Sequence, residues 1–81
     1  MDKLLTQKIA GMVQNHRKKS GLSQKELAQL AGVGKTAVFD IEHAKATVQL
    51  KTLIQVFEAL NIQIKFSSPL LKAMRKENAA G

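Results

Sequence analysis

The chain has 81 residues and a net charge of +7, from 13 Lys and Arg against 6 Asp and Glu, with a pI near 10.1. That length suits one small domain of marginal stability, and the charge favours a polyanion such as nucleic acid as partner, the alternative being a basic but inert surface. The absence of cysteine excludes a disulfide framework and a thiolate zinc site, and the first residues lack the apolar run of a signal peptide or membrane span. We therefore expect a cytoplasmic protein with no membrane partner.

The first predicted helix covers about residues 4–20. It carries one apolar stripe at three- and four-residue spacing, which we expect to pack on the core: Leu5, Ile9, Met12 and Val13. A basic last turn matches the negative end of the helix dipole, and Gly21 follows as a stop. Lys18 and Lys19 in that turn have two possible roles: they could simply be solvated at the helix end, or they could contact phosphates.

Two short helices joined by a tight turn are predicted within residues 21–42. Ser23 and Glu26 have the spacing of a capping box, which starts a helix over residues 24–31. Two glycines then stop that helix and redirect the chain into a second one, over about residues 35–43. The residues expected to face the core are Leu27, Ala28, Leu30 and Ala31 in one helix and Val38 and Ile41 in the next.

The last third of the chain holds the clearest amphipathic pattern. A helix is predicted over residues 49–60, with this apolar face: Leu50, Leu53, Ile54, Phe57 and Leu60. Asn61 is a suitable C-cap. Residues 62–66 then alternate as in a strand, and because no other segment could pair with it, we expect pairing with a second copy through Ile62, Ile64 and Phe66. The domain would end there, leaving residues 67–81 as a tail with a short helix and a frayed end.

Catalysis is not supported by the residues. The histidines are His16 and His43, and the six carboxylates form no acid–base pair at a plausible spacing. Gly32-Val33-Gly34-Lys35-Thr36 ends like a phosphate-binding loop but lacks its spacing and preceding strand. His16 has no second ligand at a helical spacing, so we interpret it as the end of the first apolar stripe. We expect no enzyme, no metal and no cofactor.

The central residues resemble the Cro and lambda-repressor (XRE) type of helix-turn-helix protein over about residues 9–66. The matching pattern is Leu22-Ser23-Gln24-x-Glu26-Leu27-Ala28-x-x-Ala31-Gly32-Val33, then Val38-x-x-Ile41-Glu42, then Leu53 and Ala59-Leu60. Within that family the Val-Gly-x-x-x-Val-x-Asp-Ile-Glu segment is most similar to HipB-like antitoxins. The resemblance implies a mainly α fold, a lambda-repressor-like bundle of four helices with a C-terminal β-strand that pairs across a dimer. It also implies a HipA-type kinase toxin as a partner.

The resemblance also implies roles for individual residues. The third helix would enter the major groove by its N-terminal end, where the base-reading residues would be Lys35, Thr36, Phe39 and Asp40. The phosphate-binding residues would be Ser23, Gln24, Lys25, His43 and Lys45. For Ser23 a purely capping role is also open, and Asp40 could instead orient a lysine. Arg17 and Glu42 would form a structural ion pair. Ala44 departs from the family pattern, which commonly has glycine there, so the geometry of the turn before Lys45, and with it the reach of His43 and Lys45, is left open.

These observations predict a homodimer that represses transcription by binding a palindromic operator, as a toxin–antitoxin autoregulator. The alternative is an antitoxin that acts mainly by sequestering a HipA-type kinase toxin. A nonspecific binder of unpaired nucleic acid is disfavoured, because the chain has no Trp or Tyr and only 3 Phe on which bases could stack.

Overall fold

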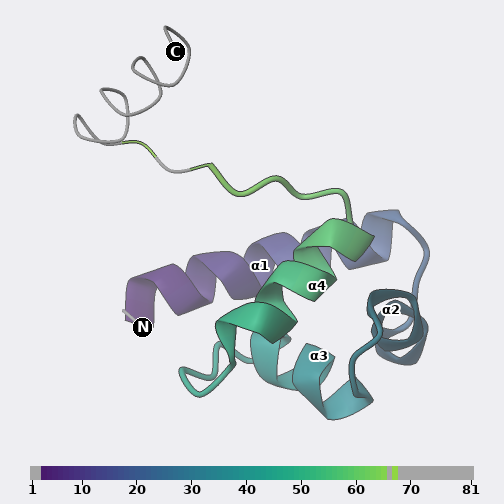
Figure 1. Ribbon diagram of the computed structural model, residues 1–81. Helices are drawn as coiled ribbons and strands as arrows, with labels where there is room; N and C mark the ends of the chain where they lie inside the picture. Colours follow the sequence, from purple (N-terminus) through teal and green to yellow (C-terminus); the bar gives the residue numbers. More distant parts are fainter. Residues whose placement is uncertain (1–2, 66, 68–81) are drawn as a thin grey trace, which may run out of the picture.

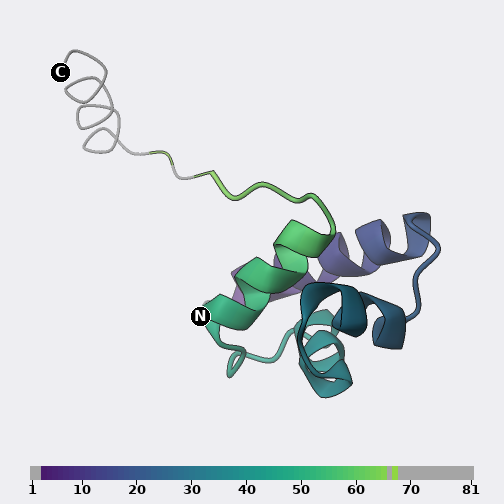
Figure 2. The same cartoon turned by 45° about the vertical axis from the view of Figure 1, so that its right-hand side comes forward.

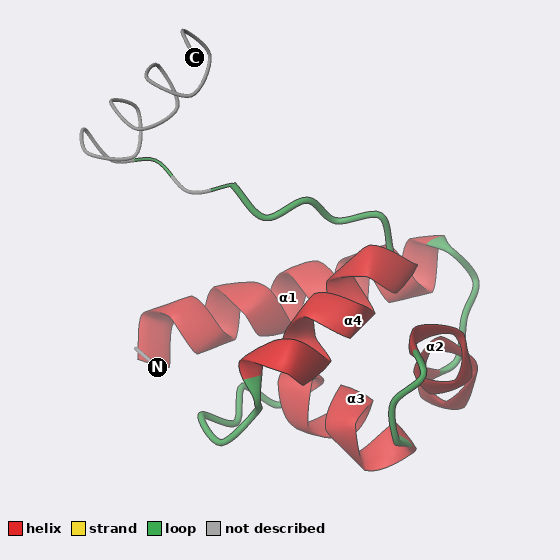
Figure 3. Cartoon of the chain, in the orientation of Figure 1, coloured by secondary structure: helices red, strands yellow, loops and turns green. Residues whose placement is uncertain are grey.

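Four helices account for most of the computed structural model, which describes residues 3–65 and 67. In chain order they are α1 (Lys3–Lys19), α2 (Gln24–Ala31), α3 (Lys35–Glu42) and α4 (Leu50–Ala59) (Figures 1 and 3). The predicted mainly α, four-helix bundle is confirmed. Phe66 and residues 68–81, which include nearly all of the predicted tail, lie outside the described residues. Within the described range, no helix is both long and apolar enough to cross a bilayer.

The start of α2 is set by the predicted capping box. The Ser23 hydroxyl accepts a hydrogen bond from the Glu26 amide at 3.0 Å, and the Glu26 carboxylate accepts one from the Ser23 amide at 2.9 Å. These bonds lower the pKa of Glu26, because they favour the charged carboxylate. Two amides that the helix itself leaves unpaired are thereby satisfied.

Removing this cap is expected to destabilise the protein modestly. Ser23→Ala leaves the Glu26 amide without its hydroxyl acceptor, and we expect a loss of about 1 kcal/mol in the free energy of unfolding. Ser23→Asp is the matched control, since aspartate caps equally well. Urea unfolding followed by circular dichroism would measure both, and a Ser23→Ala protein as stable as the Ser23→Asp protein would contradict the assignment.

Each helix ends in the same kind of turn, with one residue in the left-handed conformation: Gly21 (φ 72°), Gly32 (φ 73°), Ala44 (φ 57°) and Asn61 (φ 58°). The next amide bonds back into the helix, as from Lys45 to the Asp40 carbonyl at 3.0 Å. The predicted stops at Gly21 and Asn61 are therefore confirmed. Ala44 forms the same turn as the glycines, although a methyl group makes this conformation less favourable.

One core joins the four helices, and α3 contacts each of the other three. Its buried residues are Val13 from α1, Leu27 and Ala28 from α2, Val38 and Ile41 from α3, Leu53, Val56 and Phe57 from α4, and Leu60 directly after it. Four of these side chains are completely covered: Val13, Leu27, Val38 and Val56. Each covered side chain of this size contributes about 1.5–3 kcal/mol, so the core holds the two short central helices in place.

The core differs from the predicted one on α1 and α4. On α1 the buried residues are Thr6, Ala10 and Val13, whereas Leu5 and Met12 from the predicted stripe are exposed. On α4, Val56 is buried instead of the predicted Leu50 and Ile54, which are 66% and 37% exposed. The small side chains of Thr6 and Ala10 let the neighbouring helices pack closely against α1. The buried face of α1 therefore includes them and excludes the larger side chains of Leu5 and Met12.

Leu30 of α2 was also expected to face the core but is 63% exposed. The buried residues of α2 are Leu27 and Ala28, so the packed face of this short helix is narrower than the apolar pattern predicts.

The segment after α4 forms no strand within the described residues 62–65. A strand requires a hydrogen-bonding partner, and no other strand is present among residues 3–65. Ile62 packs against the core, while Ile64 is 40% exposed. The strand and its pairing across a dimer therefore stay predictions.

Candidate nucleic-acid interface

The outer face of α3 presents most of the predicted base-reading residues. Val38 and Ile41 anchor the helix in the core, at 0% and 3% exposure, and the opposite side chains of Lys35, Thr36 and Phe39 are exposed. Gly34 precedes the helix in an extended conformation and caps it without a side-chain hydrogen bond. The first turn of α3 is therefore open to an approaching ligand, with a cationic side chain at its first position.

A buried ion pair between Arg17 of α1 and Glu42 of α3 fixes the orientation of α3. Arg17 Nε donates to Glu42 Oε2 at 2.6 Å and Nη2 donates to Oε1 at 3.1 Å, while Nη1 donates to the Leu22 carbonyl at 2.8 Å. The Glu42 side chain is 1% exposed and that of Arg17 12%. The structure thus brings together the two residues that the resemblance pairs, and links both helices to the turn before α2.

Electrostatics keep this pair charged despite its burial. Burial raises the pKa of Glu42, but hydrogen bonds from Arg17 and Gln24 and the charges of Arg17 and Lys18 outweigh it, so the pKa is lowered overall. The hydrogen bond with Glu42 correspondingly raises the pKa of Arg17. The guanidinium therefore compensates the desolvation of the carboxylate.

Gln24 belongs to the same cluster. Its Nε2 donates to Glu42 Oε1 at 3.2 Å, so its amide nitrogen faces the ion pair rather than open solvent. The predicted phosphate contact of Gln24 would have to be made by a side chain that also supports α3. Ser23 is similarly occupied by the capping box, and Lys25 beside it is exposed.

Asp40 lies beside a lysine. Asp40 Oδ1 is 3.3 Å from Lys45 Nζ, with side-chain exposures of 25% and 54%. Of the two roles left open for Asp40, this geometry favours the placement of a neighbouring lysine, and that lysine is Lys45 rather than Lys35. The pair is partly exposed, so its main effect is on charge at the surface rather than on stability.

Phe39 and His43 stack on each other. The sequence analysis gave them separate roles, in base reading and in phosphate binding, and did not predict this contact. Their ring centroids are 3.8 Å apart at an interplanar angle of 21°, and His43 Nδ1 is 2.8 Å from the Phe39 carbonyl oxygen. Because a carbonyl only accepts, Nδ1 carries a hydrogen, and a phosphate contact would fall to Nε2 of a protonated ring. Their four-residue spacing in one helix is the signal that could have revealed the pair.

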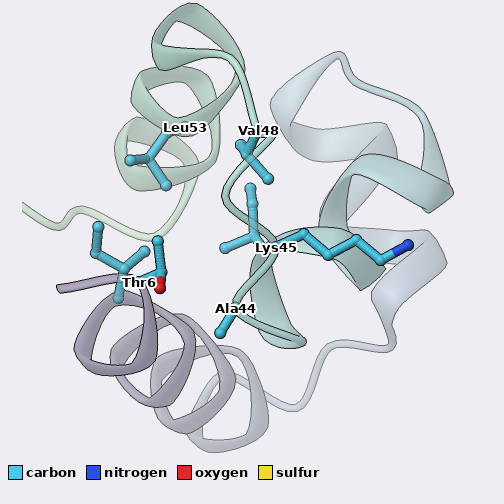
Figure 4. Close-up of a pocket in the computed structure, with 7 residues that line it drawn as sticks. Thr6, Ala44, Lys45, Val48 and Leu53 are labelled. Atoms are coloured by element: carbon cyan, nitrogen blue, oxygen red, sulfur yellow. The ribbon is translucent and has the colours of Figure 1, made fainter. Parts of the chain in front are cut away.

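A small hollow lies behind this face, between α1, α4 and the connection that follows α3 (Figure 4). Its volume is about 10 Å³, and Thr6, Ala44, Val48 and Leu53 are among the residues that line it. That space accommodates about one water molecule. The Lys45 ammonium points away from the hollow (Figure 4). The hollow is thus too small for an effector, and Lys45 is directed toward the surface.

The arrangement matches a known family of proteins. The helix-turn-helix family model covers residues 13–66, which is more than half of the chain. The chain belongs to the helix-turn-helix family of transcriptional regulators. The XRE-type resemblance seen in the sequence is thereby confirmed.

Two relatives support the assignment to this helix-turn-helix family. An uncharacterized HTH-type transcriptional regulator of Sinorhizobium fredii (strain NBRC 101917 / NGR234), y4mF, is 38% identical over 61 residues, which are 75% of this chain and 80% of the relative. The control protein C.SmaI of Serratia marcescens is 34% identical over 56 residues, 69% of this chain and 67% of that protein.

Solved structures share the helix-turn-helix fold. A chain of the HipA-HipB-O2-O3 complex and a chain described as MDT protein each match with a TM-score of 0.70 and 19% identity, covering 79% of this chain and 90% of theirs. At 19% identity, this similarity establishes the fold of the chain and does not identify what the chain binds.

Proposed function

We propose that the protein is a sequence-specific repressor that binds a palindromic operator as a homodimer, with α3 of each copy in one of two successive major grooves about 34 Å apart. The observation that carries this proposal is the fixed orientation of α3. The ion pair of Arg17 with Glu42 and the buried Val38 hold one side of the helix, so the exposed side of its first turn is presented as a rigid surface.

In this proposal the first turn of α3 reads bases. Lys35 donates to guanine O6 and N7, Thr36 contacts the adjacent base, and Phe39 contacts a thymine methyl at the edge of its stack with His43. Asp40 acts mainly through Lys45. The phosphate contacts come from the surrounding residues: Ser23, Gln24, Lys25, His43 and Lys45.

The dimer would form through the segment that carries Ile62, Ile64 and Phe66. Two copies of this segment can pair as antiparallel strands about a two-fold axis, which gives each a partner that residues 3–65 of its own chain do not supply. A two-fold dimer also explains why the operator would be palindromic.

Selection from a random library of double-stranded DNA would test this function. We expect the full chain to enrich an inverted repeat whose half-sites lie about 10 base pairs apart, and to bind it about a thousandfold more tightly than unrelated duplexes. Equal affinity for selected and unselected duplexes at physiological salt would contradict the proposal.

A toxin–antitoxin role is the finer part of the proposal. The resemblance of the Val-Gly-x-x-x-Val-x-Asp-Ile-Glu segment to HipB-like antitoxins supports an antitoxin that represses its own promoter, and the chain shares its fold with a chain of the HipA-HipB-O2-O3 complex. The same likeness supports the second candidate function, in which sequestration of a HipA-type kinase toxin is the main activity. Co-purification with a kinase encoded beside this chain would favour the second function, provided that the complex does not bind operator DNA.

Asp40 is expected to restrain binding to DNA. Asp40→Asn removes a negative charge next to the interface and releases Lys45 from its partner at 3.3 Å. We expect affinity for any duplex to rise by about threefold, because Lys45 no longer shares its charge between Asp40 and the phosphate that it contacts. The control is Asp40→Asn combined with Lys45→Ala, which should abolish the gain. Fluorescence anisotropy titrations over a range of salt concentrations would measure it, and unchanged affinity of Asp40→Asn would contradict the role.

A further inference from the structure

The exposed ring of His43 is held by two contacts at the C-terminal end of α3. It stacks on Phe39 with the centroids 3.8 Å apart, and Nδ1 lies 2.8 Å from the Phe39 carbonyl oxygen. Both contacts come from one residue a helical turn earlier, so α3 itself positions the ring. In both views α3 lies on one side of α4 and the segment of residues 62–65 leaves on the other, so α3 is separate from the segment proposed for the dimer (Figures 1 and 2).

The hydrogen bond to the Phe39 carbonyl limits what the neutral His43 ring can offer to DNA. A neutral imidazole carries one hydrogen, and the carbonyl requires it on Nδ1, which leaves a lone pair on Nε2. A DNA phosphate is an anion that only accepts hydrogen bonds, so Nε2 of the neutral ring cannot bond to it. The other neutral tautomer would direct a lone pair of Nδ1 at the carbonyl oxygen. A phosphate contact therefore requires a second proton, on Nε2.

Protonation supplies this donor and keeps both contacts of the ring. The imidazolium still donates from Nδ1 to the Phe39 carbonyl, and its positive charge lies over the face of the Phe39 ring, as in a cation–π contact. A charge-assisted hydrogen bond from Nε2 to a phosphate is also stronger than a neutral one. The same ring position thus changes from an acceptor to a charged donor.

The charged groups around His43 are engaged with one another. Along the chain, Asp40 pairs with Lys45, and Glu42 is bonded to Arg17 of α1. The other charged residues of the last turn of α1, of α2 and of α4 form no ion pair with α3: Lys18, Lys19, Lys25, Glu26, Lys51 and Glu58. Among residues 3–65, Nε2 of His43 has no partner, which leaves it open to an anion from outside the chain.

We propose that His43 binds a DNA phosphate as the imidazolium, so that each copy takes up one proton when it binds DNA. This inference rests on the proposed function, in which His43 contacts a phosphate, and adds a control by pH between 6 and 8, where histidine ordinarily titrates. Because the bound form holds one more proton per copy, linkage requires affinity to rise as the pH falls. The repressor would therefore hold its operator more tightly as its surroundings acidify.

Titration of DNA at two pH values tests the proton uptake. The probes are a duplex with the selected inverted repeat and an unrelated duplex of equal length, because a phosphate contact does not depend on sequence. By fluorescence anisotropy, we expect the affinity of the full chain for both duplexes to fall about tenfold from pH 6 to pH 8, about threefold for each of two copies, since an exposed contact is screened. The salt slope should fall by about one per copy over the same range.

The two histidines provide a matched pair of variants. His16 Nδ1 lies 2.7 Å from the Met12 carbonyl oxygen, so this exposed ring is held in the same way, but on α1. His43→Gln should bind with equal affinity at pH 6 and pH 8, whereas His16→Gln should keep the parental pH dependence. His43→Arg is charged at both pH values and should bind at pH 8 as tightly as the parent does at pH 6. The amino terminus also titrates in this range, and His43→Gln retains it.

Folding is not expected to respond to this change of pH. The pKa of Glu42 is lowered, so its ion pair with Arg17 stays charged from pH 6 to pH 8, and circular dichroism should show the same helices. Calorimetric titrations in buffers of different ionisation enthalpy should detect proton uptake by the parent that His43→Gln lacks. Equal parental affinity at the two pH values would overturn the proposal, and so would a pH dependence that survives in His43→Gln or disappears in His16→Gln.

The two duplexes separate this inference from the proposed function. A parent that prefers the selected repeat but binds it equally at both pH values overturns the proton uptake and leaves sequence-specific binding intact. A parent that binds both duplexes equally, with a pH dependence that requires His43, overturns sequence-specific binding and leaves the proton uptake intact.

Discussion

Replacing Glu42 with alanine is expected to lower the free energy of unfolding by about 3 kcal/mol, a large share of the stability of a domain this small. Arg17, whose side chain is 12% exposed in the intact protein, would lose both of its hydrogen bonds to the carboxylate. Gln24 would lose its acceptor as well. Guanidinium chloride unfolding followed by circular dichroism would measure the change.

Two controls separate the ion pair from ordinary truncation of a helical residue. Arg17→Lys keeps the positive charge but loses the two-pronged geometry, so its loss should be smaller than that of Glu42→Ala. Gln14→Ala changes an exposed residue of α1 and should stay within about 0.5 kcal/mol of the parent. If Glu42→Ala were as stable as Gln14→Ala, the cluster would not hold α3.

The same carboxylate predicts a sensitivity to acid. Because the folded pKa of Glu42 is lowered, its contribution to stability is complete above the unfolded pKa of about 4.3 and is lost as the pH falls through the folded pKa. Glu42→Gln should therefore lose less stability between pH 5 and pH 2 than the parent does. Equal losses in the two proteins over that range would contradict the lowered pKa.

Lys35→Ala is expected to abolish most of the discrimination between operator and unrelated DNA. Each copy would lose a bidentate contact worth about 1–3 kcal/mol, so a dimer should lose about thirtyfold or more in specificity ratio. Lys45→Ala should instead weaken binding to all sequences alike and reduce the salt slope by about one per copy. Competition titrations of both variants would compare these effects, and a Lys35→Ala protein that keeps the parental specificity ratio would contradict base reading by α3.

The sequence was sufficient for features that depend on neighbours along the chain. The boundaries of α2, the capping box of Ser23 with Glu26, and the left-handed turns at Gly21 and Asn61 all match their predictions. Each depends on hydrogen bonds between residues at most five apart, so local residue types decide it. The helix-turn-helix family was identified from the sequence for the same reason, because its motif is a series of such local signals at a fixed spacing.

Burial on the longer helices depended on tertiary structure. Periodicity defines an apolar face on α1 and α4, but only the neighbouring helices decide which part of that face is covered, and here Leu5, Met12 and Leu50 are left outside. The pairing of Asp40 with Lys45 likewise required the turn at Ala44 to be in place. The sequence by itself determined where the helices of the reading unit begin and end. Only the tertiary structure decided which large apolar residues stay exposed, because the helices packed against α1 cover the side that carries the small residues Thr6 and Ala10.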